Sequence, residues 1–372
     1  APTGIDDYRR PTMDGFLLSR ADRTVHATGT RRLHTDLKSA SESLRRGKAE
    51  LIAGALPFAP DRPVALTEPE HVTVTDGPWP PPDDLPEPPP VRIAAQTPPP
   101  RIHLARIRSI LDRIDLGEVD KVVAGRRVAL AADTPIDPLA VAARMVVRHP
   151  TASTYAVDLS AAGEHYWGHT LVGASPELLV RVRDGSVTCR PLAGTAPRSA
   201  DPDIDDTTGH ALLSSAKNRA EHAFVTDRIA QRLRPLCSDL QVPSGPELTS
   251  TPDVWHLATT ITGTLLDRAT GALAVAAALH PTPAVAGTPT EAALAAIRGI
   301  EGDRRFFGGA VGWCDSNGDG DWIVAIRGAE ISSDGLRALA WAGGGIVAGS
   351  DPDEELDETT AKLRTLLGAL GL

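Results

Sequence analysis

Residues 306–331 read FFGGAVGWCDSNGDGDWIVAIRGAEI and contain two apolar runs on either side of a turn-rich centre. The runs at 308–314 and 322–331 are rich in β-branched and aromatic residues, which predicts two strands. The centre, DSNGDGDW at 315–322, opens like a calcium-binding loop, but its twelfth position is Ile326, where such loops have glutamate. A hairpin turn between antiparallel strands is the better interpretation.

The same patterns assign elements to the rest of the chain. Strands are expected at 16–29 (a strand–turn–strand), 51–58, 121–131, 155–159, 177–182, 186–190, 255–265 and 336–342. Helical spacing of apolar residues predicts helices at 35–48, 102–114, 208–234 and from about 353 onward. Hairpins in succession, interrupted by a few long helices, favour the α+β class over a repeated βαβ unit.

A proline-rich stretch divides the chain. Residues 78–100 hold 11 of the 32 prolines and are expected to form an extended connector without helix or strand ladder. The segment before it, 1–77, has too few predicted elements for a domain of its own. We therefore expect 1–77 to join the main fold, which the body of the chain at 101–372 builds.

The bulk composition excludes several classes of protein. A net charge of −10 argues against a nucleic-acid partner and against an anionic membrane surface. The longest apolar run, ALAVAAAL at 272–279, is too short to span a bilayer, and the first twenty residues lack the apolar core of a signal peptide. Three widely spaced cysteines show no metal-ligand or disulfide spacing, so we expect a protein of the reducing cytoplasm.

Carboxylates are concentrated at the start of the last predicted helix. The segment SDPDEELDETTAK at 350–362 places six of them within eight positions. Ser350 is the predicted N-cap, with Asp353 at the capping-box position, and acids here also favour the positive end of the helix dipole. Most of these acids are explained as a capped, solvated helix start.

Glu355, Glu358 and Lys362 in this helix recur on one stripe beside its leucine face. The helix predicted at 208–234 carries another acid, Glu221, on the same face as Asn218. Two such faces could share Mg²⁺, which binds one or two protein carboxylates together with an anionic substrate group. Spacing alone leaves this alternative open beside a solvated acidic surface.

Eight segments of the chain, in order, resemble the chorismate-utilising enzymes, the family of anthranilate synthase component I. They cover most of the chain after the proline-rich connector, and a weaker match, LIAGALPFAPDRP, precedes it. The eight are KVVAGR (121–126), GASPELL (173–179), PLAGTAPR (191–198), AEHAFVTD (220–227), VWHLATTITG (254–263), LHPTPAVAGTP (279–289), 306–331 as quoted above, and AGGGIVAGSDPDEELDET (342–359) with Lys362.

The resemblance implies one large α+β domain of stacked antiparallel sheets flanked by helices, with 101–372 as the catalytic core. The implied substrate is chorismate, which carries a ring carboxylate and an enolpyruvyl carboxylate. In the isochorismate branch of the family, water adds at ring C2 and the C4 hydroxyl leaves. Such a reaction needs a base, an acid and neutralisation of the ring carboxylate.

The resemblance also implies roles for individual residues. Lys121 stands where the family has its base and Glu177 where it has its acid. For these roles the pKa of the lysine must be lower, and the pKa of the glutamate higher, than in water. Burial causes both shifts, because it disfavours the charged form of each side chain.

Metal and substrate positions follow from the same motifs. Glu221 and Glu358 match the Mg²⁺ ligands and Glu355 matches the acid behind them, whereas Asn218 falls where relatives usually have an acid, which puts metal affinity in question. Arg327 is implied to clamp the enolpyruvyl carboxylate in bidentate geometry. The other implied substrate contacts are Gly194, Thr195, His256, Ala284, Val285, Phe307, Gly344, Gly345 and Lys362, and GGGIVA (343–348) is expected to be a tight glycine turn.

Two residues favour the isochorismate branch. Ala284 stands where relatives that use ammonia or eliminate pyruvate typically have threonine, and Phe307 replaces a tyrosine typical of the salicylate and anthranilate branches. The chain has no glutamine amidotransferase segment, and we expect a monomer that needs no such subunit. The alternatives are a salicylate synthase, which releases pyruvate, and an ammonia-using aminodeoxychorismate or aminodeoxyisochorismate synthase.

Overall fold

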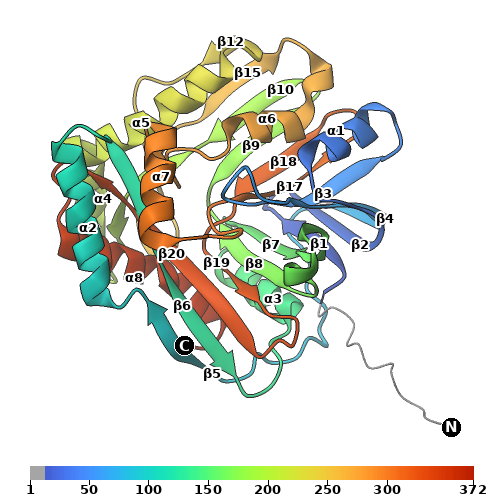
Figure 1. The fold of residues 1–372 in the computed structure, drawn as a ribbon, viewed down its shortest axis with the longest axis horizontal. Helices are drawn as coiled ribbons and strands as arrows, with labels where there is room; N and C mark the ends of the chain where they lie inside the picture. The colour runs from blue at the N-terminus through green and yellow to red at the C-terminus, as the bar shows by residue number, and fades with distance from the viewer. Residues whose placement is uncertain (1–12) are drawn as a thin grey trace.

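The computed structural model describes residues 13–372; the first twelve residues, on which part of the signal-peptide prediction rests, lie outside it. Seventeen of the strands form one continuous antiparallel sheet (Figure 1). They are β1 (Gly15–Ser19), β2 (Arg23–His34), β3 (Leu51–Leu56), β4 (Ala65–Asp76), β5 (Val91–Thr97), β6 (Lys121–Ala132), β7 (Ser153–Asp158), β8 (Thr170–Ser175), β9 (Leu178–Arg183), β10 (Ser186–Arg190), β12 (Cys237–Gln241), β15 (Ile261–Leu265), β16 (Gly287–Thr288), β17 (Ala310–Asp315), β18 (Gly320–Val324), β19 (Gly328–Ile331) and β20 (Arg337–Val347).

The pairing of these strands has two halves. The first half runs β5, β6, β20, β19, β8, β7, and β16 pairs with β6 beside β5. The second half runs β3, β17, β18, β9, β10, β15, β12. Strands β1, β2 and β4 join β7 to β3, so the N-terminal strands connect the two halves.

The two halves face each other across an inner core that, among the side chains the structure describes, is built from strands, loops and a short 3-10 helix and includes none from an α-helix. Alternation along the strands accounts for this: Ile323 of β18 and Leu171 of β8 belong to the inner core, whereas their neighbours Trp322 and Val172 point to the outer faces. The predicted α+β class and stacked antiparallel sheets are confirmed by this arrangement.

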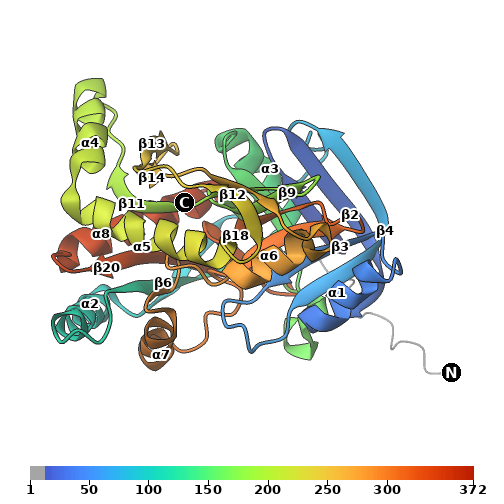
Figure 2. The ribbon, with the colours of Figure 1, turned by 90° about the horizontal axis from the view of Figure 1, so that it is seen from above.

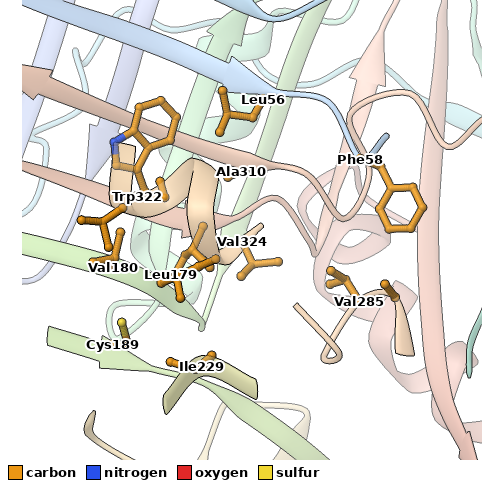
Figure 3. Close-up of a cluster of buried hydrophobic side chains, with 14 of the residues drawn as sticks. Leu56, Phe58, Leu179, Val180, Cys189, Ile229, Val285, Ala310, Trp322 and Val324 are labelled. Atoms are coloured by element: carbon orange, nitrogen blue, oxygen red, sulfur yellow. The ribbon is translucent and has the colours of Figure 1, made fainter. Parts of the chain in front are cut away.

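Helices cover both outer faces. Against the first half pack α3 (Pro138–Arg148) and α8 (Pro352–Ala369); against the second half pack α1 (Leu37–Arg45), α5 (Ala216–Leu233) and α6 (Gly271–Leu279). Figure 3 shows part of the latter core, including Trp322, Cys189 and Ile229 of α5. The helices α2 (Pro100–Asp115) and α7 (Thr290–Glu301) contact β6.

A separate three-stranded sheet, β11 (Leu192–Pro197), β14 (Val254–Ala258) and β13 (Glu247–Ser250), packs against α4 (Pro202–Ser214) and α5. In Figure 2, α4 projects from the end of the molecule opposite β2 and β4. Among residues 13–372, no helix is long and apolar enough to cross a membrane, and the three cysteines are free and buried.

The stretch 306–331 forms three strands, so the prediction of two was wrong. Strand β18 belongs to the second half and β19 to the first, and the chain crosses between them at 325–327. Arg327 adopts a left-handed backbone conformation (φ 56°) at this crossing. A bulky residue takes this conformation only where its surroundings impose it.

Other predicted elements are divided or displaced. The helix predicted at 208–234 is two helices, because the Ser215 side chain accepts a hydrogen bond from the Asn218 N–H and begins α5. The strand predicted at 255–265 divides into β14 and β15, which lie in different sheets. The strands β4, β8, β11, β12, β13 and β16 and the helices α3, α6 and α7 were not predicted.

Three local predictions were also wrong. The connector at 78–100 contains β5, because the run between Pro90 and Pro98 has free N–H groups that pair with β6. Asp351, not Ser350, caps α8 by accepting from the Asp353 and Glu354 N–H groups. The glycines at 343–345 lie within β20 and not in a turn.

Candidate active site

A cavity lies where β6, β20 and the crossing at 325–327 meet β11, β14 and α5. Eleven of the predicted site residues line it: Glu177, Gly194, Thr195, Glu221, His256, Ala284, Val285, Phe307, Arg327, Gly345 and Lys362. A wider cavity adjoins it, since Thr195 and Glu221 line both. Glu355 and Glu358 line this second cavity, so the two predicted acidic helix faces meet here.

Lys121 is the first residue of β6, and its backbone is held between Val347 of β20 and Thr288 of β16. Its side chain is fully buried, and Nζ lies 3.0 Å from Oε1 of Glu221 on α5. Among residues 13–372, Nζ has no aligned hydrogen-bond partner. The ammonium group is therefore placed by one ion pair behind Glu221, which lines the cavity, whereas Lys121 is not itself a lining residue.

Glu177 follows β8 in the turn that leads into β9, and it is 3% exposed. Burial raises the pKa of Glu177 to about 7, while the Leu192 N–H and the positive charges of Lys121, Lys362 and Arg327 limit the rise. A carboxyl group with this pKa is protonated in a large fraction of molecules at neutral pH, so it can donate a proton to a bound ligand.

Arg327 and His256 form a second buried pair. Burial lowers the pKa of Arg327 to about 10, so the guanidinium stays charged. Burial, and next the positive charge of Arg327, hold the pKa of His256 well below its ordinary value. Arg327 Nη2 lies 3.0 Å from His256 Nε2, which must be the acceptor because arginine only donates. The imidazole proton is then on Nδ1, 3.2 Å from Thr195 Oγ1 and 3.4 Å from the Gly194 carbonyl.

The glycines of β20 make room for the acidic groups. A Cβ at Gly345 would lie 2.1 Å from Glu221 Oε1 and 2.9 Å from Lys121 Cε. A Cβ at Gly344 would lie 3.1 Å from Glu355 Oε2 and 3.6 Å from Glu358 Oε1. Gly345 therefore has a steric requirement, because any side chain there would displace the Lys121–Glu221 pair.

Each of the three glutamates is paired with a lysine. Beside the Lys121–Glu221 pair, Lys217 Nζ lies 2.9 Å from Glu355 Oε1, and Lys362 Nζ lies 2.6 Å from Glu358 Oε1. Lys362 also donates to the Gly343 carbonyl, and Ser350 Oγ donates to Glu355 Oε1 at 2.8 Å.

These acids fit a hard divalent cation in part. Burial raises the pKa of Glu355 to about 7, with further contributions from Glu358 and Glu221, and its Oε2 is buried without a hydrogen-bond partner in the described chain. An acidic oxygen left in this way is a ready ligand or acceptor. Within residues 13–372, no group of three or more acids, histidines or cysteines is placed so that it could hold a metal ion by itself.

Asn218 does not contribute a ligand. Its side chain donates to Ser215 Oγ at 2.9 Å at the start of α5, although it lines the second cavity with Glu221, Glu355 and Glu358. An asparagine at this position carries no negative charge, and both predicted ligands, Glu221 and Glu358, are present beside it.

Comparisons with known proteins identify the family of the chain. Residues 81–371 match the family model described as "Chorismate binding enzyme". The chain belongs to the chorismate binding enzymes. Relatives include "Putative isochorismate synthase MenF" of Mycobacterium tuberculosis (50% identical, 96% of each chain) and "Isochorismate synthase DhbC" of Bacillus subtilis (42% identical, 93% of this chain and 88% of that one).

A solved structure is also similar over nearly the whole chain. It is the "putative 2,3-dihydroxybenzoate-specific isochorismate synthase, DhbC from Bacillus anthracis", with a TM-score of 0.90 and 36% identity over 99% of this chain and 98% of that one. The N-terminal strands and the junction between sheet halves are therefore part of a known arrangement for a chorismate binding enzyme.

Two residues of the site were missed in the sequence. Trp341 of β20 stacks on Phe307, with ring centroids 6.0 Å apart and planes 7° apart, and both rings line the first cavity. Lys217 precedes Glu221 by one helical turn in KNRAEH, and this spacing was a signal that it lies on the acidic face.

Proposed function

We propose that this chorismate binding enzyme is an isochorismate synthase, acting on chorismate in the cavity lined by Glu177 and Arg327. The observation that carries the proposal is one cavity lined by a buried carboxyl group with a raised pKa, Glu177, and by a charged arginine, with the buried Lys121 directly behind Glu221 of the cavity wall. The printed names of the relatives support the same activity.

The proposed reaction exchanges two oxygens and needs two proton transfers. Lys121, in its uncharged form, takes a proton from the water that attacks ring C2. The ring double bonds shift, and the C4 hydroxyl leaves as water with the proton of Glu177. The cycle ends with Lys121 charged and Glu177 ionised, and one proton returning from the lysine to the carboxylate restores the starting state.

The substrate is oriented by charge. Arg327 would bind the enolpyruvyl carboxylate, since it is buried, charged and fixed through His256. Lys362 would face the ring carboxylate. Glu221 and Glu358, with Glu355 behind them, would hold Mg²⁺, which when bound neutralises the ring carboxylate. The apolar walls at Ala284, Val285 and Phe307 exclude additional water from the ring.

The product distinguishes the branches of the family. With chorismate and MgCl₂, the protein is expected to form isochorismate as its one product, resolved by liquid chromatography. Removing the ion with EDTA is expected to lower the rate by about a hundredfold or more, restored by excess MgCl₂. Release of salicylate and pyruvate, or an amino product with ammonium salts, would contradict the isochorismate assignment.

Substitution of Gly345 tests the packing of the site. Gly345→Ala places a methyl group 2.1 Å from Glu221 Oε1, so the Lys121–Glu221 pair must shift. We expect turnover to fall about a hundredfold, since a displacement of about 1 Å has this effect on a positioned catalytic group.

The matched control is Gly299→Ala on α7, where a Cβ meets nothing within 4 Å. It should keep full activity and raise the free energy of unfolding by about 0.5–1 kcal/mol. Equal activity of both variants would show that Gly345 is not constrained by the site.

We further propose that the enzyme works in the cytoplasm as a monomer without an amidotransferase subunit. The acidic net charge and the buried, unpaired cysteines support a reducing compartment.

A further inference from the structure

Lys217 differs from the other two lysines of the acidic site. Lys121 is fully buried, and Lys362 has a second acceptor in the Gly343 carbonyl. The Lys217 side chain is 28% exposed and lines the wider cavity, and its ion pair with Glu355 is its one hydrogen bond to the described chain. It lies in the first turn of α5, from which its flexible stem can reach solvent.

The charges of the site determine which group must move when an ion binds. Each of the three acids proposed for the metal site already has a lysine as its partner, so an incoming divalent cation meets an ammonium group at every one of them. The Lys217 ammonium group lies 2.9 Å from Glu355 Oε1, where its positive charge opposes that of the ion. The ion is therefore repelled unless an ammonium group withdraws from the acids.

Glu355 is prepared for such a withdrawal. Its Oε1 keeps a hydrogen bond from Ser350 Oγ at 2.8 Å if Lys217 leaves, so the carboxylate stays in place. Its buried Oε2 has no partner in the described chain, and with Glu358 Oε1 it lies beside Gly344, where there is no side chain. Withdrawal of Lys217 thus leaves an oriented carboxylate and no steric obstacle.

We propose that Lys217 is an internal competitor of the divalent cation: it neutralises Glu355 in the free enzyme and withdraws to solvent when the ion binds. The inference rests on the metal site of the proposed function and adds a positioning residue to it. Because the substrate brings two negative charges, ion and substrate together restore neutrality. The enzyme therefore holds the ion weakly alone and tightly with its dianionic ligand.

Binding of Mn²⁺ alone, counted by electron paramagnetic resonance without chorismate, tests the proposal independently of turnover. Lys217→Gln is expected to bind Mn²⁺ about fivefold more tightly than the wild type, since one opposing charge is removed close to the ion. Arg364→Gln is the matched control, because Arg364 of α8 lines the same cavity but Glu355 pairs with Lys217 instead. This control should stay within about twofold of the wild type.

A double variant tests whether Lys217 and the ion compete for the carboxylate of Glu355. In a Glu355→Gln background, Lys217→Gln should give no further gain, because the shared carboxylate is gone. Unchanged or weaker Mn²⁺ binding by Lys217→Gln, or an equal gain in Arg364→Gln, would overturn the inference while leaving the metal site intact. If Glu358→Gln does not weaken Mn²⁺ binding in any variant, the proposed metal site fails and the inference fails with it.

Discussion

Lys121→Ala is expected to lower isochorismate formation by about a thousandfold, within the range that a positioned base contributes. Lys121 is the fully buried amine at the cavity edge, and no other lysine side chain is buried to this extent among residues 13–372. The variant also leaves Glu221 without its cation, and breaking such a buried pair typically costs about 3–5 kcal/mol of unfolding free energy. Activity and thermal unfolding must therefore be measured together.

Lys121→Arg separates the two effects. Arginine keeps the positive charge beside Glu221 but does not give up its proton in proteins, so it can maintain the ion pair and cannot act as a base. We expect this variant to recover most of the unfolding free energy lost in Lys121→Ala and to remain inactive. Substantial turnover by Lys121→Arg would mean that the lysine serves only as a charge.

Glu177→Gln is expected to lower turnover by about a hundredfold to ten-thousandfold, because the amide keeps the shape but cannot transfer a proton. In the wild type, kcat/KM should fall as pH rises above about 7, where the carboxyl group of the free enzyme loses its proton. A Glu177→Gln variant with more than about a tenth of wild-type turnover would contradict the acid role.

Glu177→Gln, which lowers turnover, is expected to raise the stability of the folded protein at alkaline pH. The pKa of Glu177 is about 7 in the folded protein and 4.5 in the unfolded chain, so the folded state binds this proton more tightly. The stabilising contribution of the proton is complete below pH 4.5 and is lost as pH rises through 7, which amounts to up to about 3 kcal/mol. Glu177→Gln should therefore unfold at higher temperature than the wild type at pH 8, and at nearly the same temperature at pH 5.

Local sequence patterns were sufficient to predict the α+β fold class and many of the helices and strands. Apolar alternation placed the strands around 306–331, and helical spacing placed α1, α2 and α8, because these signals depend on near neighbours in the chain. The division of 208–234 had a local signal as well: Ser215 is a good N-cap residue in the middle of the predicted helix.

Other features depend on contacts between distant segments. The break at Arg327 is imposed by the separation of β18 and β19 into different sheet halves, and nothing in VAIRGAEI indicates it. Ser350 was the predicted N-cap of α8, but Asp351 caps the helix in the structure. Ser350 does not cap it because its Oγ donates a hydrogen bond to Glu355. These outcomes are decided by tertiary hydrogen bonds that compete with local preference.

The site residues were predicted from family motifs and not from physical patterns. A lysine at the start of a strand and a glutamate after a turn are ordinary, and only the fold makes both of them buried neighbours of one cavity. The Lys121–Glu221 and Lys217–Glu355 pairs were likewise not visible in the sequence, because their members are 100 and 138 positions apart. The Glu358–Lys362 pair, in contrast, lies within one turn of α8, on the stripe that the sequence already showed.

The left-handed residue between β18 and β19 restricts how the polypeptide can be rearranged. Arg327 is held in its conformation because the chain is covalently continuous from one sheet half to the other on either side of it. A circularly permuted chain should therefore keep the site if its new termini lie in the surface turn at 315–319. New termini at 325–327 would disrupt the site. Arg327, for which we propose binding of the substrate carboxylate, belongs to neither sheet half, so a protein assembled from two separate halves would not hold it in this position.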